Sequence, residues 1–157
     1  MTAITPHPTS ELVAIAWTGS LPNLTTQMVA VQLPPRTSWT GNTFVTVTVV
    51  GGSPLTDVLI RQSVVQYECW GVKQDSDKPF WAAANQVAEQ IIFGSKLKEL
   101  FGRPLPITSG GKQYNGAQVM ESTVLTDPRR KWDDPGYYAC YTFDMRMVWR
   151  EQGLVYN

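Results

Sequence analysis

Histidine is almost absent from this chain, and cysteine is scarce. The 157 residues include one His, His7, and two Cys, Cys69 and Cys140. Acid-base catalysis near neutral pH usually uses histidine, and His7 stands between two prolines in a segment, residues 1–8, that we expect to be flexible. Nucleophilic triads need a base beside the Ser or Cys, and metal sites need clustered ligands. We therefore expect no enzyme activity, no cofactor, no metal site, and two buried free thiols.

The chain also lacks an excess of charge of either sign. Thirteen Lys and Arg balance thirteen Asp and Glu, and charged residues make up 17% of the sequence. Proteins that grip nucleic acid through long-range attraction usually carry a clear positive excess. The low charged fraction favours either a surface that meets another chain or a solvated surface rich in Thr and Gln.

Long hydrophobic runs are missing as well. No stretch approaches the roughly 20 apolar residues that cross a bilayer. The first ten residues have neither the basic start nor the apolar core of a secretion signal. We therefore expect a protein that is made inside a cell and has no membrane partner.

Several short motifs suggest chemistry, but each has a simpler explanation. The run Gly110-Gly111-Lys112 lacks the spacing and the following Ser or Thr of a phosphate-binding loop, so we predict an ordinary turn. The acidic pairs Asp75/Asp77 and Asp133/Asp134 lie in polar turns, where Asp is favoured for backbone capping. The basic and aromatic run at 129–132 is followed at once by two acids, which favours a neutralised hairpin loop over a DNA-binding patch.

Hydrophobic periodicity predicts the secondary structure. Period-two alternation predicts strands at 44–50, 61–71, 117–125 and 138–150, with the last two forming a hairpin, and a short edge strand at 28–33. Helical spacing predicts a main helix from Phe80 to Gly94, entered through Asp77 and Pro79, and minor helices at 9–17 and 97–101. We expect Gly51-Gly52 to end the first long strand, with loops at 53–59 and 103–116.

The order of these elements predicts one α+β domain over residues 1–157. We expect a mixed, mainly antiparallel sheet of about four or five strands, packed on one face by one main and one or two minor helices. One face of the strand at 61–71, which carries Gln66, Glu68 and Trp70, is expected to be wet or to meet a partner.

Five segments follow one another in an order that points to a family. They are the helix Thr9–Ala14 behind a proline-bearing start, the strand Phe44–Gly52, the segment Leu59–Gly71, the turn Lys78–Trp81 with the helix Ala82–Glu89, and the closing strand Tyr138–Arg150. In this order they resemble the tail terminator proteins of long, non-contractile-tailed (siphovirus-type) bacteriophages, especially those that infect actinobacteria. The resemblance spans most of the chain, and its motifs are structural.

The resemblance implies a non-enzymatic virion subunit that forms a ring, expected to be a hexamer. Such a ring sits on the last ring of the major tail tube protein, stops tube growth, and joins the tail to the head-tail connector or stopper. It would lie at the head-proximal end of the tail after assembly in the host cytoplasm, and genomic DNA would pass through its lumen without sequence-specific binding. A terminator ring must therefore have the surface that binds the last tube ring, and must lack the surface that would bind a further ring.

We place candidate contact residues in the loops and in the basic run. They are Gly51, Gly52, Pro54, Leu55, Lys112, Arg129, Arg130, Lys131 and Trp132. Two alternatives stay open. Another structural virion protein, such as a stopper or the tube subunit itself, predicts rings with a different neighbour or stacks of identical rings, and a tube subunit usually has a long hairpin arm and a majority of strands. A small-ligand binder or enzyme predicts a closed pocket with convergent polar groups.

Overall fold

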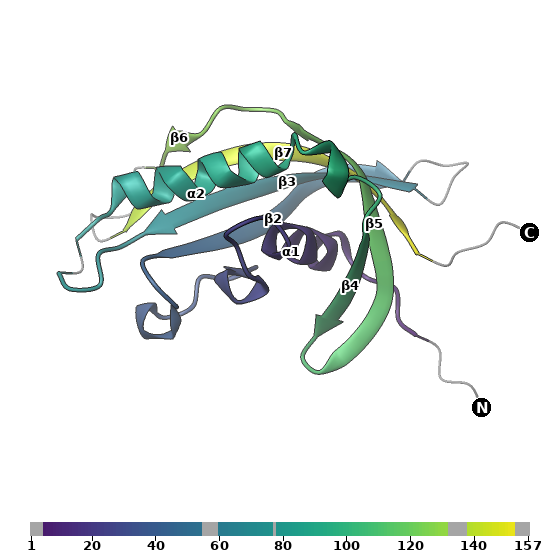
Figure 1. Ribbon diagram of the computed structural model, residues 1–157, viewed down its shortest axis with the longest axis horizontal. Coiled ribbons are helices and arrows are strands. Elements are labelled where there is room, and N and C mark those ends of the chain that lie inside the picture. The colour runs from purple at the N-terminus through teal and green to yellow at the C-terminus, as the bar shows by residue number, and fades with distance from the viewer. Residues whose placement is uncertain (1–4, 55–59, 77, 132–137, 153–157) are drawn as a thin grey trace, which may run out of the picture.

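One curled sheet organises the computed structural model, which describes residues 5–54, 60–76, 78–131 and 138–152 (Figure 1). The strand order is β1-β2-β3-β7-β5-β4, and β6 pairs with β7 off this path. All pairs are antiparallel except β1 with β2. The strands are β1 (Val29–Ala30), β2 (Thr43–Pro54), β3 (Ile60–Gly71), β4 (Pro104–Ser109), β5 (Lys112–Val124), β6 (Arg129–Arg130) and β7 (Ala139–Glu151). The α+β prediction is confirmed, with seven strands in place of four or five.

Two α-helices accompany the sheet, α1 (Ser10–Gly19) and α2 (Trp81–Gly94). The hydroxyl of Thr9 caps α1 by accepting a hydrogen bond from the backbone N–H of Leu12 at 3.2 Å, as such residues do at helix starts. The predicted entry of α2 is wrong in detail, because α2 begins after Phe80 without a side-chain cap. Asp77 lies outside the described residues. Single 3-10 turns occur at Thr26–Met28, Arg36–Ser38 and Lys98–Leu100.

Both helices pack on the same face of the sheet, here called the helix face. Residues directly opposite each other in an antiparallel pair share a face, and Tyr67 of β3 stands opposite Phe143 of β7. The Tyr67 hydroxyl lies 2.8 Å from Thr18 Oγ1 of α1. Trp81 of α2 meets the ring of Tyr141 edge to face, with 5.9 Å between the centroids.

The hydrophobic core fills the helix face. Alternate residues of β7 point into it, as the period-two pattern predicts, and Phe143, Met145, Met147 and Trp149 are fully buried. The stripe of α2 lies on the same core through Ala84, Val87, Ala88 and Ile91. Cys69 is part of this core and is a free thiol, as predicted.

A smaller cluster occupies one end of the opposite face. Trp39, from the connection between β1 and β2, packs with Phe44, Trp70, Val72 and Cys140. Cys140 is likewise buried and forms no disulfide, and its Sγ donates to the carbonyl oxygen of Tyr141 at 3.9 Å. The cluster covers the sheet only near the start of β7, because Phe44, Trp70 and Cys140 belong to one row of paired residues across β2, β3 and β7.

The predicted end of the first long strand is wrong. The Gly51-Gly52 pair does not end β2, because the strand passes a bulge after Val49 and continues to Pro54. Gly52 has φ +128°, and a Cβ there would collide with the backbone of Gln62, so only glycine fits. A bulge of this kind lets a strand bend without ending.

The predicted loop at 103–116 is a hairpin of β4 and β5. Pro104 and Pro106 suggest a loop, but prolines are tolerated in a strand at the edge of a sheet. The connection Gly110-Gly111 is a two-residue turn with φ +59° and +77°, the conformation that tight hairpins favour. The prediction of an ordinary turn before Lys112 is confirmed.

Candidate assembly surface

Among the described residues, no element covers the face of the sheet opposite the helices beyond the Trp39 cluster, and we call this part the open face. The strand register defines it as three rows of paired residues across β2, β3, β7 and β5. Its members are Thr48, Gln62, Val64, Gln66, Glu121, Thr123, Asp144, Arg146 and Val148. None of these side chains is fully buried. A four-stranded surface of this kind is wide enough to receive an element of another chain.

Apolar side chains occupy the centre and the borders of the open face. Val64 and Val148 are half-buried at its centre. Val50 and Met120 lie at the bulges of β2 and β5 and are 53% and 40% exposed, and Leu125, just after β5, is 48% exposed. These three are among the five large apolar side chains that are exposed in the described part of the chain. Their grouping around one surface favours a contact with another molecule.

Three consecutive outward residues of β7 have polar atoms that are buried without a hydrogen-bond partner among the described residues. These atoms are Thr142 Oγ1, Asp144 Oδ1 and Arg146 Nε. Thr142 is only 6% exposed. Arg146 uses another nitrogen for an ion pair with Glu121 at 3.2 Å. Since an unsatisfied buried polar atom costs about 1–3 kcal/mol, this row destabilises the single chain, and a contact that moves these side chains could relieve the cost.

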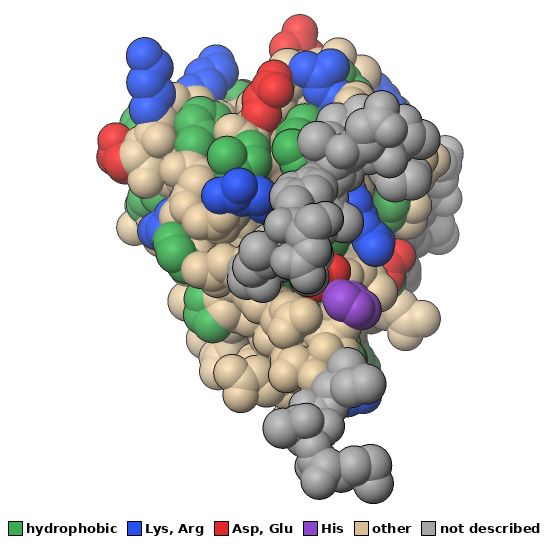
Figure 2. All heavy atoms as spheres, turned by 90° about the vertical axis from the view of Figure 1, so that its right-hand side faces the viewer, with side chains coloured by type: hydrophobic (Ala, Val, Ile, Leu, Met, Phe, Trp, Pro, Cys, Tyr) green, Lys and Arg blue, Asp and Glu red, His purple; other side chains and the backbone are tan. Residues whose placement is uncertain are grey.

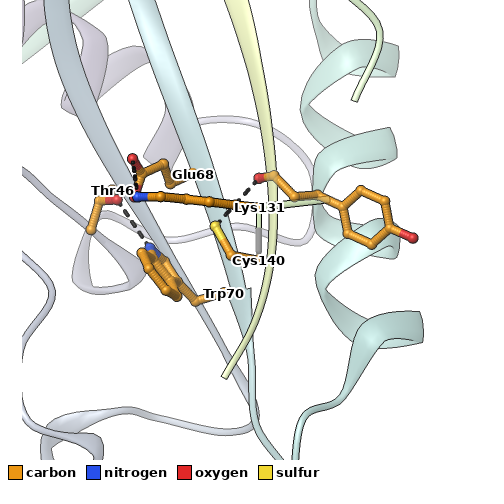
Figure 3. A network of polar contacts seen from close by, with 6 residues as sticks. Thr46, Glu68, Trp70, Lys131 and Cys140 are labelled. Atoms are coloured by element: carbon orange, nitrogen blue, oxygen red, sulfur yellow. Dashed lines mark hydrogen bonds and ion pairs between the residues drawn. The ribbon is translucent and has the colours of Figure 1, made fainter. Parts of the chain in front are cut away.

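The basic run at 129–131 is held by its own chain. The Lys131 ammonium lies 3.2 Å from Glu68 Oε1 and over the ring of Trp70, whose Nε1 donates to Thr46 Oγ1 (Figure 3). This network closes the open face at the end of the Trp39 cluster. Asp133 and Asp134, the acids predicted to neutralise this run, lie outside the described residues, and the acid that pairs with Lys131 is Glu68 of β3.

Arg130 points the other way, onto the helix face. Its guanidinium stacks over Trp81 of α2 at 4.6 Å from the ring centroid, and its Nε donates to the Tyr141 hydroxyl at 3.2 Å. Arg129 is exposed and donates to Thr126 Oγ1 at 3.4 Å. Arg130 and Lys131 therefore contact opposite faces of the sheet and do not form one positive patch.

The structure separates the candidate contact residues into groups. Gly51 and Gly52 lie where β2 pairs with the start of β3, beside the C-terminal end of β7, whereas Arg129 and Arg130 pair with its N-terminal end. Through Val64 and Ser63, the two glycines align with Arg146 and Met147, which lie about five residues, or about 17 Å, along β7 from the partners of the two arginines. Lys112 is exposed at the turn of the β4–β5 hairpin. Pro54 ends β2, and Leu55 and Trp132 lie outside the described residues.

The open-face residues were not among these candidates. The sequence carried a signal for them, since period-two alternation at 61–71 predicts a face that is wet or meets a partner. Only the register of β3 with β7, and the absence of a covering helix, distinguishes Val64 and Val148 from ordinary surface valines.

The N-terminal segment is attached where it is described. The backbone N–H of Asn115 donates to the carbonyl of Pro6, and His7 Nδ1 lies 2.7 Å from Glu151 Oε2, which also accepts from Asn115 Nδ2 at 3.2 Å. Figure 2 shows this end of the molecule, with His7 in purple among Asp and Glu atoms in red. Pro6 and His7 thus contact β5 and β7, and the flexibility expected of residues 1–8 stays a prediction.

Two buried titratable side chains of the core, Tyr67 and Cys69, have raised pKa values. Burial raises the pKa of the Tyr67 phenol far above its usual value, although the hydrogen bond to Thr18 lowers it in part. Burial also raises the pKa of the Cys69 thiol. Both groups are therefore protonated at neutral pH, and Cys69 lacks the thiolate that a nucleophile needs.

The hollows of the surface are open. One of about 600 Å³ lies between Ser10 at the start of α1 and residues 49–52 and 61–63, near the turn end of the β2–β3 hairpin. Its described lining includes Arg61 and no carboxylate, so these residues do not supply the convergent acid pair of a hydrolytic site. Within residues 5–54, 60–76, 78–131 and 138–152, no group of three or more His, Cys, Asp or Glu could hold a metal ion. None of the helices in these ranges is long and apolar enough to span a membrane.

Comparisons with known proteins give little sequence information. No protein-family model matches the chain, and no curated protein matches it. Among solved structures, one chain of the assembly described as "Virion of native gene transfer agent (GTA) particle" is similar, with 13% sequence identity and a TM-score of 0.45. The match covers 90% of this chain and 86% of that chain. A TM-score below 0.5 at 13% sequence identity carries no argument about function.

Proposed function

We propose that this chain is a structural virion protein, the tail terminator of a long-tailed bacteriophage. Copies of it form a ring, expected to be a hexamer, that caps the tail tube, stops its polymerisation and joins the tail to the head connector. The family follows from the order of the five sequence segments that resemble tail terminators. The observation that carries an assembly role is the open face of the sheet.

The open face has no role in closing the core of a single copy. The helix face already buries the large apolar side chains of β3 and β7 under α1 and α2. Exposed Val50, Met120 and Leu125, together with half-buried Val64 and Val148, are then available for contacts between chains. A contact between two different surfaces of the same chain closes into a ring when the rotation per copy divides a full turn.

A tube subunit is the second candidate, and a specific observation favours it. Seven strands and two long hairpins, β2–β3 and β4–β5, give the strand majority that tube subunits usually show. The two candidates differ in the ends of the ring. A tube subunit offers matching surfaces at both ends, whereas a terminator binds at one end and refuses further copies at the other.

The test is to image the purified protein with and without tail tubes, and to measure its mass. A terminator gives closed rings that cap one end of a tube and do not stack. Deletion of its gene from the phage that encodes it gives overlong, headless tubes. Stacked rings would assign the tube role, and a monomer whose loss leaves tail length normal would contradict both.

A further inference from the structure

Helix α2 has an outer stripe that is almost free of charge. Ala82, Gln86, Glu89 and Phe93 are exposed at helical spacing, and Gln90 beside them is half-buried. Glu89 is the one charged residue in the 14-residue helix, and it makes no ion pair with another described residue. Phe93 is 63% exposed. A solvated helix face usually carries several charges, so this stripe has the composition of a contact surface.

We propose that the outer stripe of α2 in one copy packs across the open face of the next copy. This inference rests on the proposed function, since it names the two surfaces that join neighbouring subunits of the ring. The helix face and the open face are the two opposite sides of one sheet. A single copy therefore cannot use its own α2 to cover its own open face, and each copy presents one half of the contact on each side.

Charge and polarity on the two surfaces are complementary. The open face holds Arg146, whose side chain is partly exposed beside Glu121, and the stripe offers the carboxylate of Glu89, which makes no ion pair among the described residues. The amide groups of Gln86 and Gln90 are donors that suit the half-buried carboxylate of Asp144. The contact would thus bring opposite charges and complementary polar groups together across the two surfaces.

Apolar groups and dimensions match as well. The exposed phenyl ring of Phe93 would pack against an apolar surface, and Val64 and Val148 provide such a surface at the centre of the open face. The part of the stripe from Gln86 to Phe93 is about 11 Å long, and the open-face residues of β7 from Asp144 to Val148 extend over about 13 Å. This part of the stripe therefore fits along the strands of the open face.

The first experiment mixes two variants, each with one disabled surface. Phe93→Asp disables the stripe, and Val148→Asp disables the open face. Each variant alone should lose the ring and associate at least tenfold more weakly than the parent protein. An equimolar mixture should give a one-to-one dimer and nothing larger, because each dimer retains one intact contact. Val31→Asp is the matched control, since Val31 is 41% exposed and lies on neither surface; it should assemble normally.

The second experiment is independent of whether Val148→Asp folds. A photo-reactive phenylalanine analogue at position 93 should crosslink to peptides of β3 or β7 from another copy. Crosslinks to α2 of another copy, or rings that persist in Phe93→Asp, would overturn this contact while leaving the ring itself intact. Absence of rings in the parent protein would instead contradict the proposed function.

Discussion

The hydrogen bond between Tyr67 and Thr18 fixes α1 to the sheet, and its removal has a predictable cost. Both residues are fully buried, their oxygens are 2.8 Å apart, and the Tyr67 ring stacks on Phe143 with centroids 5.1 Å apart. Tyr67→Phe keeps the stacking and deletes one oxygen, which leaves the Thr18 hydroxyl without this partner. A buried hydroxyl in that position costs about 1–3 kcal/mol of unfolding free energy. The melting temperature should fall by about 2–4 °C for each kcal/mol.

A double-mutant cycle with Thr18→Val isolates the pair. Both single variants should be destabilised, and the double variant should lose less than the sum, with a coupling free energy of about 1 kcal/mol. Urea unfolding followed by tryptophan fluorescence measures all four proteins. If the losses of unfolding free energy in the two single variants are additive, or if Tyr67→Phe lowers it by less than about 0.3 kcal/mol, this hydrogen bond does not hold α1 in place.

Three further predictions concern stability. Since the folded-state pKa of Tyr67 is raised, the folded state keeps this proton to higher pH than the unfolded state does, so the contribution of Tyr67 to the free energy of unfolding should be constant below about pH 9 and fall above pH 10 by up to about 1.4 kcal/mol per pH unit. Urea unfolding at a series of pH values should show a shallower fall for Tyr67→Phe. Gly52→Ala should lower the free energy of unfolding by more than about 1 kcal/mol, because the added Cβ would collide with the backbone of Gln62. Gly41→Ala, at φ +98° with open space around it, should lower it by less in the same urea assay. Lys131→Met should cost no more than about 1 kcal/mol because its ion pair with Glu68 is partly exposed, and a larger loss in urea unfolding would show that the pair is stronger than its exposure indicates.

The regular elements could be predicted from the sequence because their periodicity is undisturbed. The alternation in β7 runs over a dozen residues and the stripe of α2 over more than three turns, and both elements appear where they are predicted. The weaker patterns are less accurate: the helix predicted at 97–101 is a single 3-10 turn, and the strand predicted at 28–33 is two residues long. The β4–β5 hairpin could not be predicted in the same way. Pro104 and Pro106 are compatible with a strand only at a sheet edge, and that position is a property of the tertiary structure.

The candidate surface was predicted less well than the fold, for a physical reason. Arg130 and Lys131 are neighbours in sequence, but consecutive strand residues point to opposite faces, so they contact Trp81 and Glu68 on different sides. Val64 and Val148 are far apart in sequence and come together only through the register of β3 with β7. A surface made of outward strand residues is defined by strand pairing, which single-sequence patterns do not specify.

A decisive experiment is to measure the mass of the purified protein and to image it, alone and with tail tubes. A tail terminator should form closed rings, of about 105 kDa for six copies of the 17.5 kDa chain, that cap one end of a tube and add no further ring. A protein that stays a monomer beside the tubes, or that stacks into a continuous cylinder, would contradict it.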